Sequence, residues 1–213
     1  MVVRARLSPE RIVDAAVAVA DQGGLAQVSM RNVGRELGVE AMSLYHHVSD
    51  KDSLLDAMVD WIFARIELPT VDDEWRAGMA RRADSAREVL SAHPWALGLV
   101  ESRRTPGPAL LTHHNAVLGC LRRNGFSVEL ASHTFSAIDS YVYGFVLTEM
   151  NLPFSESADD FVGEFTEAMP MELYPHLAEL GAAIMESGYR FADEYRYGLD
   201  LVLDSIAERF AVS

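Results

Sequence analysis

The chain has 213 residues, of which 49% are hydrophobic and 23% are charged. This composition is typical of a globular protein of one or two domains, and it excludes a disordered tail or a collagen-like fibre. The formal net charge is -14, yet residues 1–51 hold six Lys and Arg against six Asp and Glu, which leaves twelve against twenty-six beyond residue 51. An acidic protein is a poor partner for nucleic acid. The first quarter of the chain has no net charge, however, so nucleic acid is still a possible partner.

No apolar stretch approaches the roughly 20 residues that cross a bilayer. The first residues are not followed by the apolar run of a secretory signal, so we expect a cytoplasmic protein without a membrane partner. Cys120 is the only cysteine, which excludes an internal disulfide and a multi-thiolate zinc site. We expect it to be a small core residue.

Hydrophobic residues recur at helical spacing along the chain without sustained alternation, which predicts an all-α fold. The first predicted helix begins after the N-cap Ser8 and ends at Gly23-Gly24. The second begins after the N-cap Ser29 and ends at Leu37-Gly38. A third short helix is expected over residues 41–48.

Ser49 and Asp52 form the Ser-x-x-Asp pattern of a capping box, which predicts that a longer helix begins there. Residues 68–73 resemble a linker. Proline and glycine then separate further predicted helices, near residues 74–93, 95–103, 107–124 and 127–151.

Residues 151–187 contain eight acidic residues and no Lys or Arg, and three prolines interrupt them. We therefore expect this segment to be mobile or only partly helical. A last amphipathic helix is predicted over residues 189–210.

Two short helices joined by a glycine-containing turn, residues 29–37 and 41–48, describe a helix-turn-helix whose second helix enters the major groove of DNA. Ala41 and Ser43 are short enough to let the backbone approach base edges, and Ala41 and Met42 can contact a thymine methyl group. Around them stand groups suited to phosphate: Ser29, Arg31, Tyr45, His47 and Lys51. Arg4 and Arg6 could add a loose arm along the DNA or contact nothing.

The run from Val28 to Val39, followed by Ser43 to Val48 and by Lys51, resembles the tetracycline-repressor (TetR) family of bacterial one-component regulators. The resemblance covers about residues 8–66. It implies an N-terminal three-helix DNA-binding domain, a larger helical domain that binds an effector, and a homodimer. We place the domains at residues 1–50 and 51–213, connected through the helix that starts near residue 51.

The resemblance also implies roles for single positions. Ala41 and Ser43 correspond to positions that touch base edges. The positions that touch the sugar-phosphate backbone are Ser29, Met30, Arg31, Tyr45, His47 and Lys51, although Met30 replaces a polar residue often found there. The expected function is a ligand-responsive regulator, most simply a repressor that dimerises through helices near 127–151 and 189–210, binds a palindromic operator as a homodimer and is released by a small molecule.

We expect the effector to enter among the helices that span residues 74–150. Aromatic and polar side chains are dense there, although the same side chains would serve equally as core packing. The acidic excess of this part favours a cationic effector or is simply solvated surface charge. No cofactor is expected. The candidate effector-binding residues are Trp61, Trp95, His113, Phe135, Asp139 and Tyr143.

Two other classes of protein compete with a regulator. An enzyme is not supported, because no Gly-x-Ser-x-Gly elbow occurs and His113 and His114 are adjacent, so they point about 100° apart on a helix and cannot chelate one ion. Glu172 and His176 have the i, i+4 spacing of two metal ligands on one helix face. Pro175 lies between them, however, and makes a regular helix unfavourable there. A structural protein that pairs through its terminal helices is the other alternative, and operator binding distinguishes it from a regulator.

Overall fold

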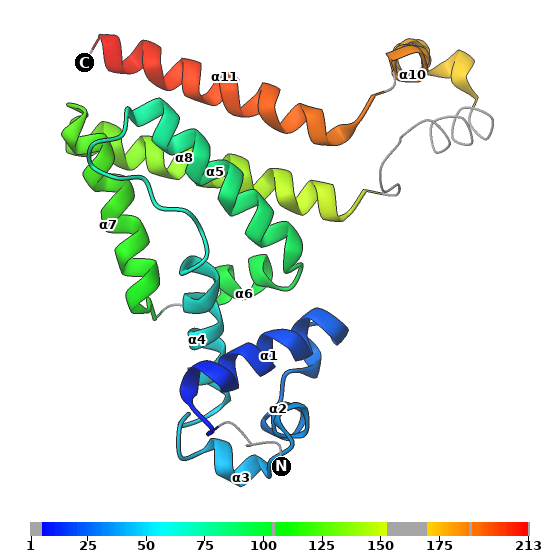
Figure 1. The fold of residues 1–213 in the computed structure, drawn as a ribbon. Helices are drawn as coiled ribbons and strands as arrows, with labels where there is room; N and C mark the ends of the chain where they lie inside the picture. Colours follow the sequence, from blue (N-terminus) through cyan, green and yellow to red (C-terminus); the bar gives the residue numbers. More distant parts are fainter. Residues whose placement is uncertain (1–5, 104, 153–169, 188, 213) are drawn as a thin grey trace. The chain divides into compact units, whose positions relative to one another are not determined.

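The computed structural model describes residues 6–103, 105–152, 170–187 and 189–212, and every regular element in these ranges is a helix (Figure 1). The predicted all-α class is therefore confirmed. None of the described helices combines the length and apolarity needed to span a membrane. The chain forms two compact units, Met1–Phe135 and Ser136–Ser213, which are described separately.

The first unit contains most of the helices. They are α1 (Pro9–Gly23), η1 (Leu25–Gln27), α2 (Met30–Leu37), α3 (Ala41–Leu44), α4 (Lys51–Phe63), α5 (Trp75–Ala92), α6 (Ala96–Ser102), α7 (Pro108–Arg123) and the start of α8 (Val128–Met150). The second unit holds the rest of α8, η2 (Met171–Leu173), α10 (Pro175–Ser187) and α11 (Phe191–Ala211).

The ends of α1 and α2 lie where the capping residues predict them. The Ser8 hydroxyl accepts a hydrogen bond from the Arg11 amide at 3.4 Å, and the Ser29 hydroxyl accepts one from the Asn32 amide at 3.2 Å. Gly38 ends α2 with φ +66°, a left-handed conformation that favours glycine. Local hydrogen bonding therefore accounts for both helices.

The helix-turn-helix is held by an unusually close approach of α2 to the chain that leads into α3. A Cβ atom built on Gly34 would lie 2.9 Å from the Val39 carbonyl oxygen and 3.3 Å from the Ala41 nitrogen. Val33 and Leu44 are fully buried beside this contact. Because Gly34 has no side chain, the two helices can pack backbone to backbone.

The third helix is shorter than predicted. It spans only Ala41–Leu44, because the amides of His47 and Val48 both donate to the Leu44 carbonyl oxygen, at 2.9 and 3.0 Å, and turn the chain away.

The start of α4 also differs from the prediction, because Asp50 rather than Ser49 is its N-cap. The Asp50 carboxylate accepts from the Ser53 amide at 2.7 Å, and this bond lowers the pKa of Asp50. Ser49 instead places its hydroxyl 2.6 Å from that of Ser53. A carboxylate is favoured over a hydroxyl at this position because it also interacts with the helix dipole.

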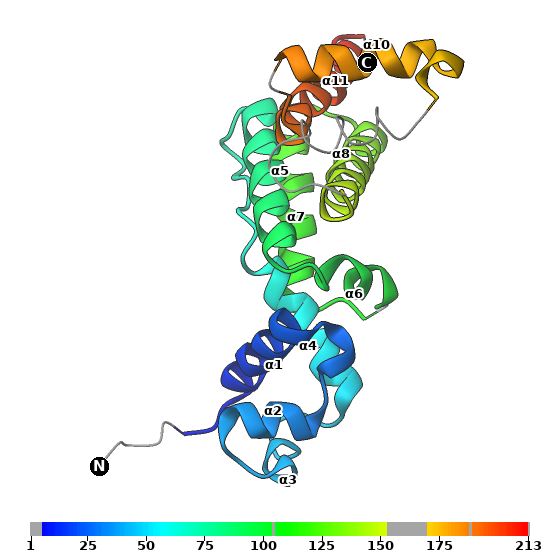
Figure 2. The same ribbon diagram turned by 90° about the vertical axis from the view of Figure 1, so that its right-hand side faces the viewer.

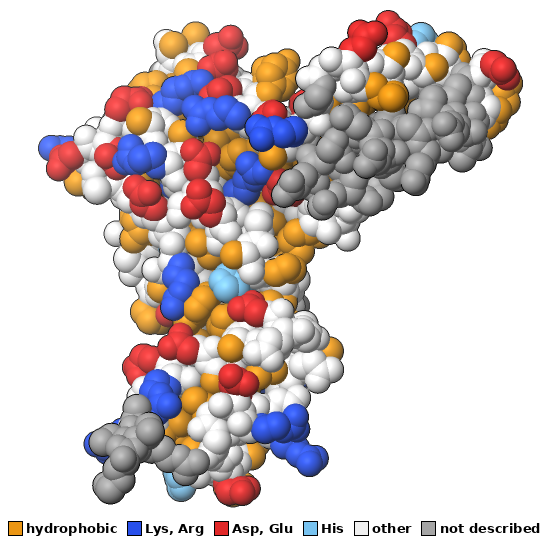
Figure 3. Space-filling view, turned by 45° about the vertical axis from the view of Figure 1, so that its right-hand side comes forward, with side chains coloured by type: hydrophobic (Ala, Val, Ile, Leu, Met, Phe, Trp, Pro, Cys, Tyr) orange, Lys and Arg blue, Asp and Glu red, His pale blue; other side chains and the backbone are white. Residues whose placement is uncertain are grey.

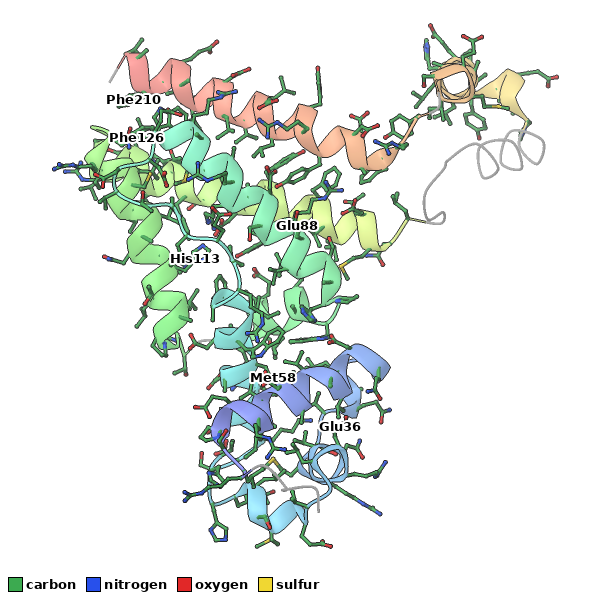
Figure 4. All side chains as sticks on the ribbon, viewed as in Figure 1. Glu36, Met58, Glu88, His113, Phe126 and Phe210 are labelled. Atoms are coloured by element: carbon green, nitrogen blue, oxygen red, sulfur yellow. The ribbon has the colours of Figure 1, made fainter. Side chains whose placement is uncertain are left out.

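Helix α4 is the centre of the first unit. It packs against α1 on one side and against α6 and α7 on the other (Figures 1 and 2). Met58, labelled in Figure 4 where α4 passes α1, is fully buried, as are Leu54 and Ile62. Movement of α4 would therefore displace α1, which packs against the helix-turn-helix, and also α6 and α7.

In the second unit α8 and α11 pair in antiparallel fashion through aromatic rings. Phe145 stacks on Phe191 with ring centroids 4.8 Å apart, and Tyr141 stacks on Tyr195 at 5.8 Å. The Tyr141 hydroxyl also donates to the Tyr195 carbonyl oxygen at 2.8 Å. Residues 153–169 of the acidic segment lie outside the described residues, whereas its end forms η2 and α10.

We predict that Gly34→Ala destabilises the protein by about 1–3 kcal/mol, because the added methyl group meets backbone atoms that cannot move aside. Urea denaturation followed by circular dichroism measures the change. Gly98→Ala is the matched control, because Gly98 is exposed on α6 with no atom near the new Cβ. Equal stability of the two variants would contradict the close-packing argument.

Candidate functional site

The side chains expected to contact DNA lie mostly on the surface of the helix-turn-helix. Met42 on α3 is 73% exposed, although it is apolar, and Tyr45 directly after α3 is also exposed. Ala41 and Ser43 are half-buried at the start of the same helix. Met42 and Tyr45 therefore give α3 and the residue after it an exposed, partly apolar surface.

Two cations beside α3 have no acidic partner in the part of the chain that the structure describes. Arg31 and Lys51 are exposed, and neither forms an ion pair with the carboxylates of the described residues. Arg103, in contrast, pairs with two carboxylates. On the face drawn in Figure 3, the end formed by α1–α3 carries separate basic and acidic groups among neutral and apolar side chains rather than a continuous basic patch.

Two of the residues predicted to contact the DNA backbone lie at the N-terminus of α2. Ser29 caps α2 with its hydroxyl, and Met30 is the first residue of that helix. The Met30 side chain is 7% exposed and lies in the core. A contact from Met30 to phosphate would therefore use its backbone amide at the helix N-terminus and not its side chain.

Both tryptophans expected at the effector site bind carboxylates of α1. The Trp61 indole donates to Asp14 and the Trp95 indole donates to Asp21, each at 2.7 Å. The ring of His93 also contacts Asp21, with Nδ1 at 2.8 Å. Asp14 and Asp21 are two helical turns apart and so lie on one face of α1. These bonds join α1 to the end of α4 and to the turn between α5 and α6.

A second set of carboxylates joins α4 to the segment that follows α6. Asp52, Asp56 and Asp60 recur every four residues and therefore share one face of α4. Arg103 donates to Asp56 at 2.5 Å and to Asp52 at 2.9 Å, and these contacts raise the pKa of its guanidinium. The Asp60 carboxylate accepts the first amides of α7, from Ala109 at 2.7 Å and Leu110 at 3.0 Å.

His113 and Phe135 meet around a buried arginine that the sequence analysis did not single out. Arg82 on α5 is 2% exposed, and its Nε donates to Nε2 of the fully buried His113 on α7 at 2.8 Å. Figure 4 labels His113 on α7, beside α5. We call this group, with the rings around it, the Arg82 cluster: Arg82, His113, Phe63, His114 and Phe135.

Three rings complete the Arg82 cluster. Phe63, the last residue of α4, meets His113 edge to face at 5.2 Å between centroids. Phe135 meets His114 in the same manner at 4.8 Å, and the Arg82 guanidinium carbon lies 5.3 Å from the Phe135 centroid. The Arg82 guanidinium thus lies near one aromatic ring, that of Phe135, and the other rings pack on the two histidines.

His113 is neutral in the folded protein. Burial, together with the charge of Arg82, lowers the pKa of His113 to about 3. Because Nε2 accepts from Arg82, the single proton must lie on Nδ1. Nδ1 is buried and has no hydrogen-bonding partner among the described residues. A buried donor left unpaired in this way costs about 1–3 kcal/mol.

The remaining effector candidates, Asp139 and Tyr143, lie in the second unit, where both are half-buried on α8. Of the proposed N-terminal arm, Arg4 lies outside the described residues, and Arg6 accepts a hydrogen bond from Arg11 through its carbonyl oxygen. The part of the chain that the structure describes contains no cluster of metal-ligating side chains.

Two features of the sequence could have indicated the residues that the sequence analysis did not single out, namely Arg82 and the aspartates of α4. Arg82 occupies the buried stripe of α5 that also contains Trp75, Met79 and Ala86, where an apolar residue is expected. A charged residue on such a stripe indicates a buried polar interaction. The regular spacing of the three α4 aspartates could also have been noticed, but nothing local identifies their partners.

Both parts of the chain match models of one protein family. Residues 12–58 match the model described as bacterial regulatory proteins of the tetR family, and residues 68–210 match the tetracyclin repressor-like C-terminal domain.

Three individual proteins show the same similarity. An HTH-type transcriptional regulator of Saccharopolyspora erythraea is 36% identical over 67% of this chain, which spans 61% of that protein's length. The HTH-type transcriptional repressor DrrR1 of Streptomyces coeruleorubidus is 31% identical over 94% of this chain and 77% of its own. The structure of the Streptomyces coelicolor protein ActR in complex with actinorhodin is similar with a TM-score of 0.78, at 25% identity over 95% of this chain and 96% of that chain.

We predict that His113 remains neutral from pH 8 down to pH 5, with its proton on Nδ1. NMR correlation of the imidazole nitrogens measures both the charge and the tautomer. The unfolded chain takes up this proton near pH 6.5 and the folded chain only near pH 3, so the folded state loses stability as the pH falls between these values. Protonation of His113 near pH 6.5 in the folded protein would contradict this account.

Proposed function

The chain belongs to the TetR family of bacterial transcriptional regulators, and from this premise we propose that it is a repressor that holds a palindromic operator as a homodimer until a small molecule releases it. Members of the family are ligand-responsive DNA-binding regulators and not enzymes. The observation that carries the proposal is the exposed surface of α3, with Arg31 and Lys51 beside it, which lack acidic partners among the described residues. The protein would act in the cytoplasm, where bacterial operators lie.

In this proposal α3 enters the major groove, and its first residues contact bases. Ala41 and Met42 supply apolar contact, and Ser43 supplies a hydroxyl. The groups that fix the position of α3 on the phosphates are Ser29, Arg31, Tyr45, His47 and Lys51, together with the backbone amide of Met30. Two such helices must lie about 34–36 Å apart to enter successive grooves, so a two-fold dimer reads a palindrome.

The proposed dimer forms through α8 and α11. Small side chains at Ala137, Ser140 and Gly144 leave one face of α8 exposed, which would let a second helix approach closely. Leu147 is 55% exposed near the end of α8, and Leu201 on α11 is 54% exposed. Two copies of each helix would cover these side chains in an intermolecular four-helix bundle.

Release is proposed to act through α4. The Asp52, Asp56 and Asp60 contacts join α4 to the segment from Arg103 to α7, and Phe63 extends α4 to the Arg82 cluster. A molecule bound among α5, α7 and the start of α8 could therefore shift α4 and the helix-turn-helix packed on it. The molecule works only if it prefers one arrangement of α4 over the other.

We predict that Lys51→Ala weakens operator binding by roughly tenfold at physiological salt and lowers the magnitude of the log-log salt slope by about two, one for each copy. Fluorescence anisotropy with a palindromic duplex selected from random DNA measures both. Arg123→Ala, which removes an exposed charge at the end of α7, is the control. An unchanged salt slope for Lys51→Ala would exclude a phosphate contact at this position.

We predict that Leu201→Glu converts the dimer into monomers and abolishes tight operator binding, because a carboxylate would be buried in the interface. Sedimentation velocity measures the oligomeric state. Leu111→Glu is the matched control, because Leu111 on α7 is also 55% exposed but lies in the first unit. A Leu201→Glu protein that remains a dimer would contradict an interface on α11.

A further inference from the structure

We propose that Asp21 is a positioning residue for operator binding, because its carboxylate fixes the end of α1 to the turn between α5 and α6. We call Asp21 and its two partners, His93 and Trp95, the Asp21 latch. The inference rests on the proposed function and adds a restraint on the DNA-reading helices that is separate from the contacts of α4. Asp21 touches no DNA in this account and acts through the orientation of α1.

The Asp21 latch is a compact set of hydrogen bonds to one carboxylate oxygen. Oδ1 of Asp21 accepts from the Trp95 indole at 2.7 Å and lies 2.8 Å from Nδ1 of His93. Because an ionised carboxylate only accepts hydrogen bonds, Nδ1 of His93 must be the donor. Trp95 is buried, so opening the latch would leave its indole N–H without water or an acceptor. The closed latch is therefore the favoured state of these three side chains.

Asp21 stands at a position that α1 itself disfavours. It lies in the last turn of the helix, which contains no basic residue. A negative charge near the C-terminus of a helix opposes the helix dipole, and aspartate is a weak helix former. The bonds to Trp95 and His93 offset these costs. The Asp21 side chain thus serves the contact between two elements rather than the helix that carries it.

The latch restrains α1 at a distance from its polar attachment to α4. Nearer the middle of α1, Asp14 accepts from the indole of Trp61 on α4 at 2.7 Å. Asp21 is seven residues further along α1, which is about 10 Å on an α-helix. Contacts with α4 alone would let α1 tilt on that helix, whereas a second attachment prevents the tilt. Because α2 packs on α1 and α3 packs on α2, the latch also fixes the direction of α3.

A tilt of α1 would change which operators a dimer accepts. The two recognition helices must match both the separation and the phase of the half-sites, and one added base pair turns a half-site by about 35°. A latched protein therefore accepts one spacing, and a protein with an open latch accepts several. Loss of folded protein, in contrast, lowers the apparent affinity for every duplex by the same factor. Spacing preference thus separates a positioning role from a merely structural one.

The test compares a palindrome selected from random DNA with the same palindrome lengthened by one or two central base pairs. Fluorescence anisotropy with the full chain gives the spacing ratio, which is the affinity for the selected duplex divided by that for a lengthened one. We expect Asp21→Ala to lower this ratio at least fivefold. Trp95→Phe, which removes the indole donor but keeps a ring, should lower it in the same direction.

Two further variants control the measurement. Asp21→Asn removes the charge but keeps an oxygen that can accept from Trp95, so it should lower the spacing ratio less than Asp21→Ala does. Asp72→Ala removes an exposed carboxylate of the linker outside the latch, and it should retain the ratio of the unsubstituted protein.

A measurement on the unsubstituted protein covers the case in which Asp21→Ala does not fold. The indole proton of Trp95, followed by NMR, should exchange slowly with solvent in the operator complex, since the latch stays closed there. An unchanged spacing ratio in Asp21→Ala, or rapid exchange of this proton in the operator complex, would each overturn the role of Asp21.

The same titrations distinguish failure of this inference from failure of the proposed function. If the unsubstituted protein selects no palindrome, the repressor proposal fails and the role of Asp21 falls with it. If it selects one and Asp21→Ala keeps the same spacing ratio, the repressor proposal stands and only the role of Asp21 is overturned.

Discussion

Three carboxylates on one face of α4 hold the segment that leads into the rest of the first unit. Asp52 and Asp56 bind Arg103, and Asp60 caps α7. The opposite face buries Leu54, Met58 and Ile62 in the core that α4 shares with its neighbours. A rigid helix that is bonded on one face and packed on the other cannot move alone, so α4 is the element through which regulation of DNA binding is proposed to act.

The location of each positive charge determines what it can do. Arg31 and Lys51 are exposed and have no acidic partners within the described ranges, so they are available to phosphate. Arg82 is buried, donates to the neutral His113 and lies near the ring of Phe135. A chain with a net charge of -14 thus keeps positive groups exposed where a polyanion is proposed to bind.

The parts of the fold that could be predicted are those decided by neighbouring residues. Ser8, Ser29 and Gly38 mark helix ends because their own side chains or φ angles satisfy the terminal amides and carbonyls. The start of α4 was misplaced by one residue because Ser49 and Asp50 are both good caps and differ only in how strongly they accept. The short α3 depends on how the Leu44 carbonyl is shared, which no spacing of hydrophobic residues reveals.

The candidate site was predicted unevenly for the same reason. The residues of the helix-turn-helix lie together in sequence, so their shared surface follows from the helical period. Trp61 and Trp95 were chosen as aromatic residues of a cavity, but their partners Asp14 and Asp21 are 47 and 74 residues away. Arg82 and His113 are 31 residues apart, and their bond depends on the packing of α5 against α7.

Operator affinity of Asp60→Ala tests the central role of α4 most directly. The variant removes the cap that joins α4 to α7, and it also removes a negative charge, which by electrostatics alone would strengthen DNA binding. The account predicts operator binding several-fold weaker than that of the unsubstituted protein at equal dimer content, with Asp72→Ala, which removes a linker carboxylate, unchanged or slightly tighter. Equal or tighter binding by Asp60→Ala would contradict the claim that the α4 contacts position the DNA-reading helices.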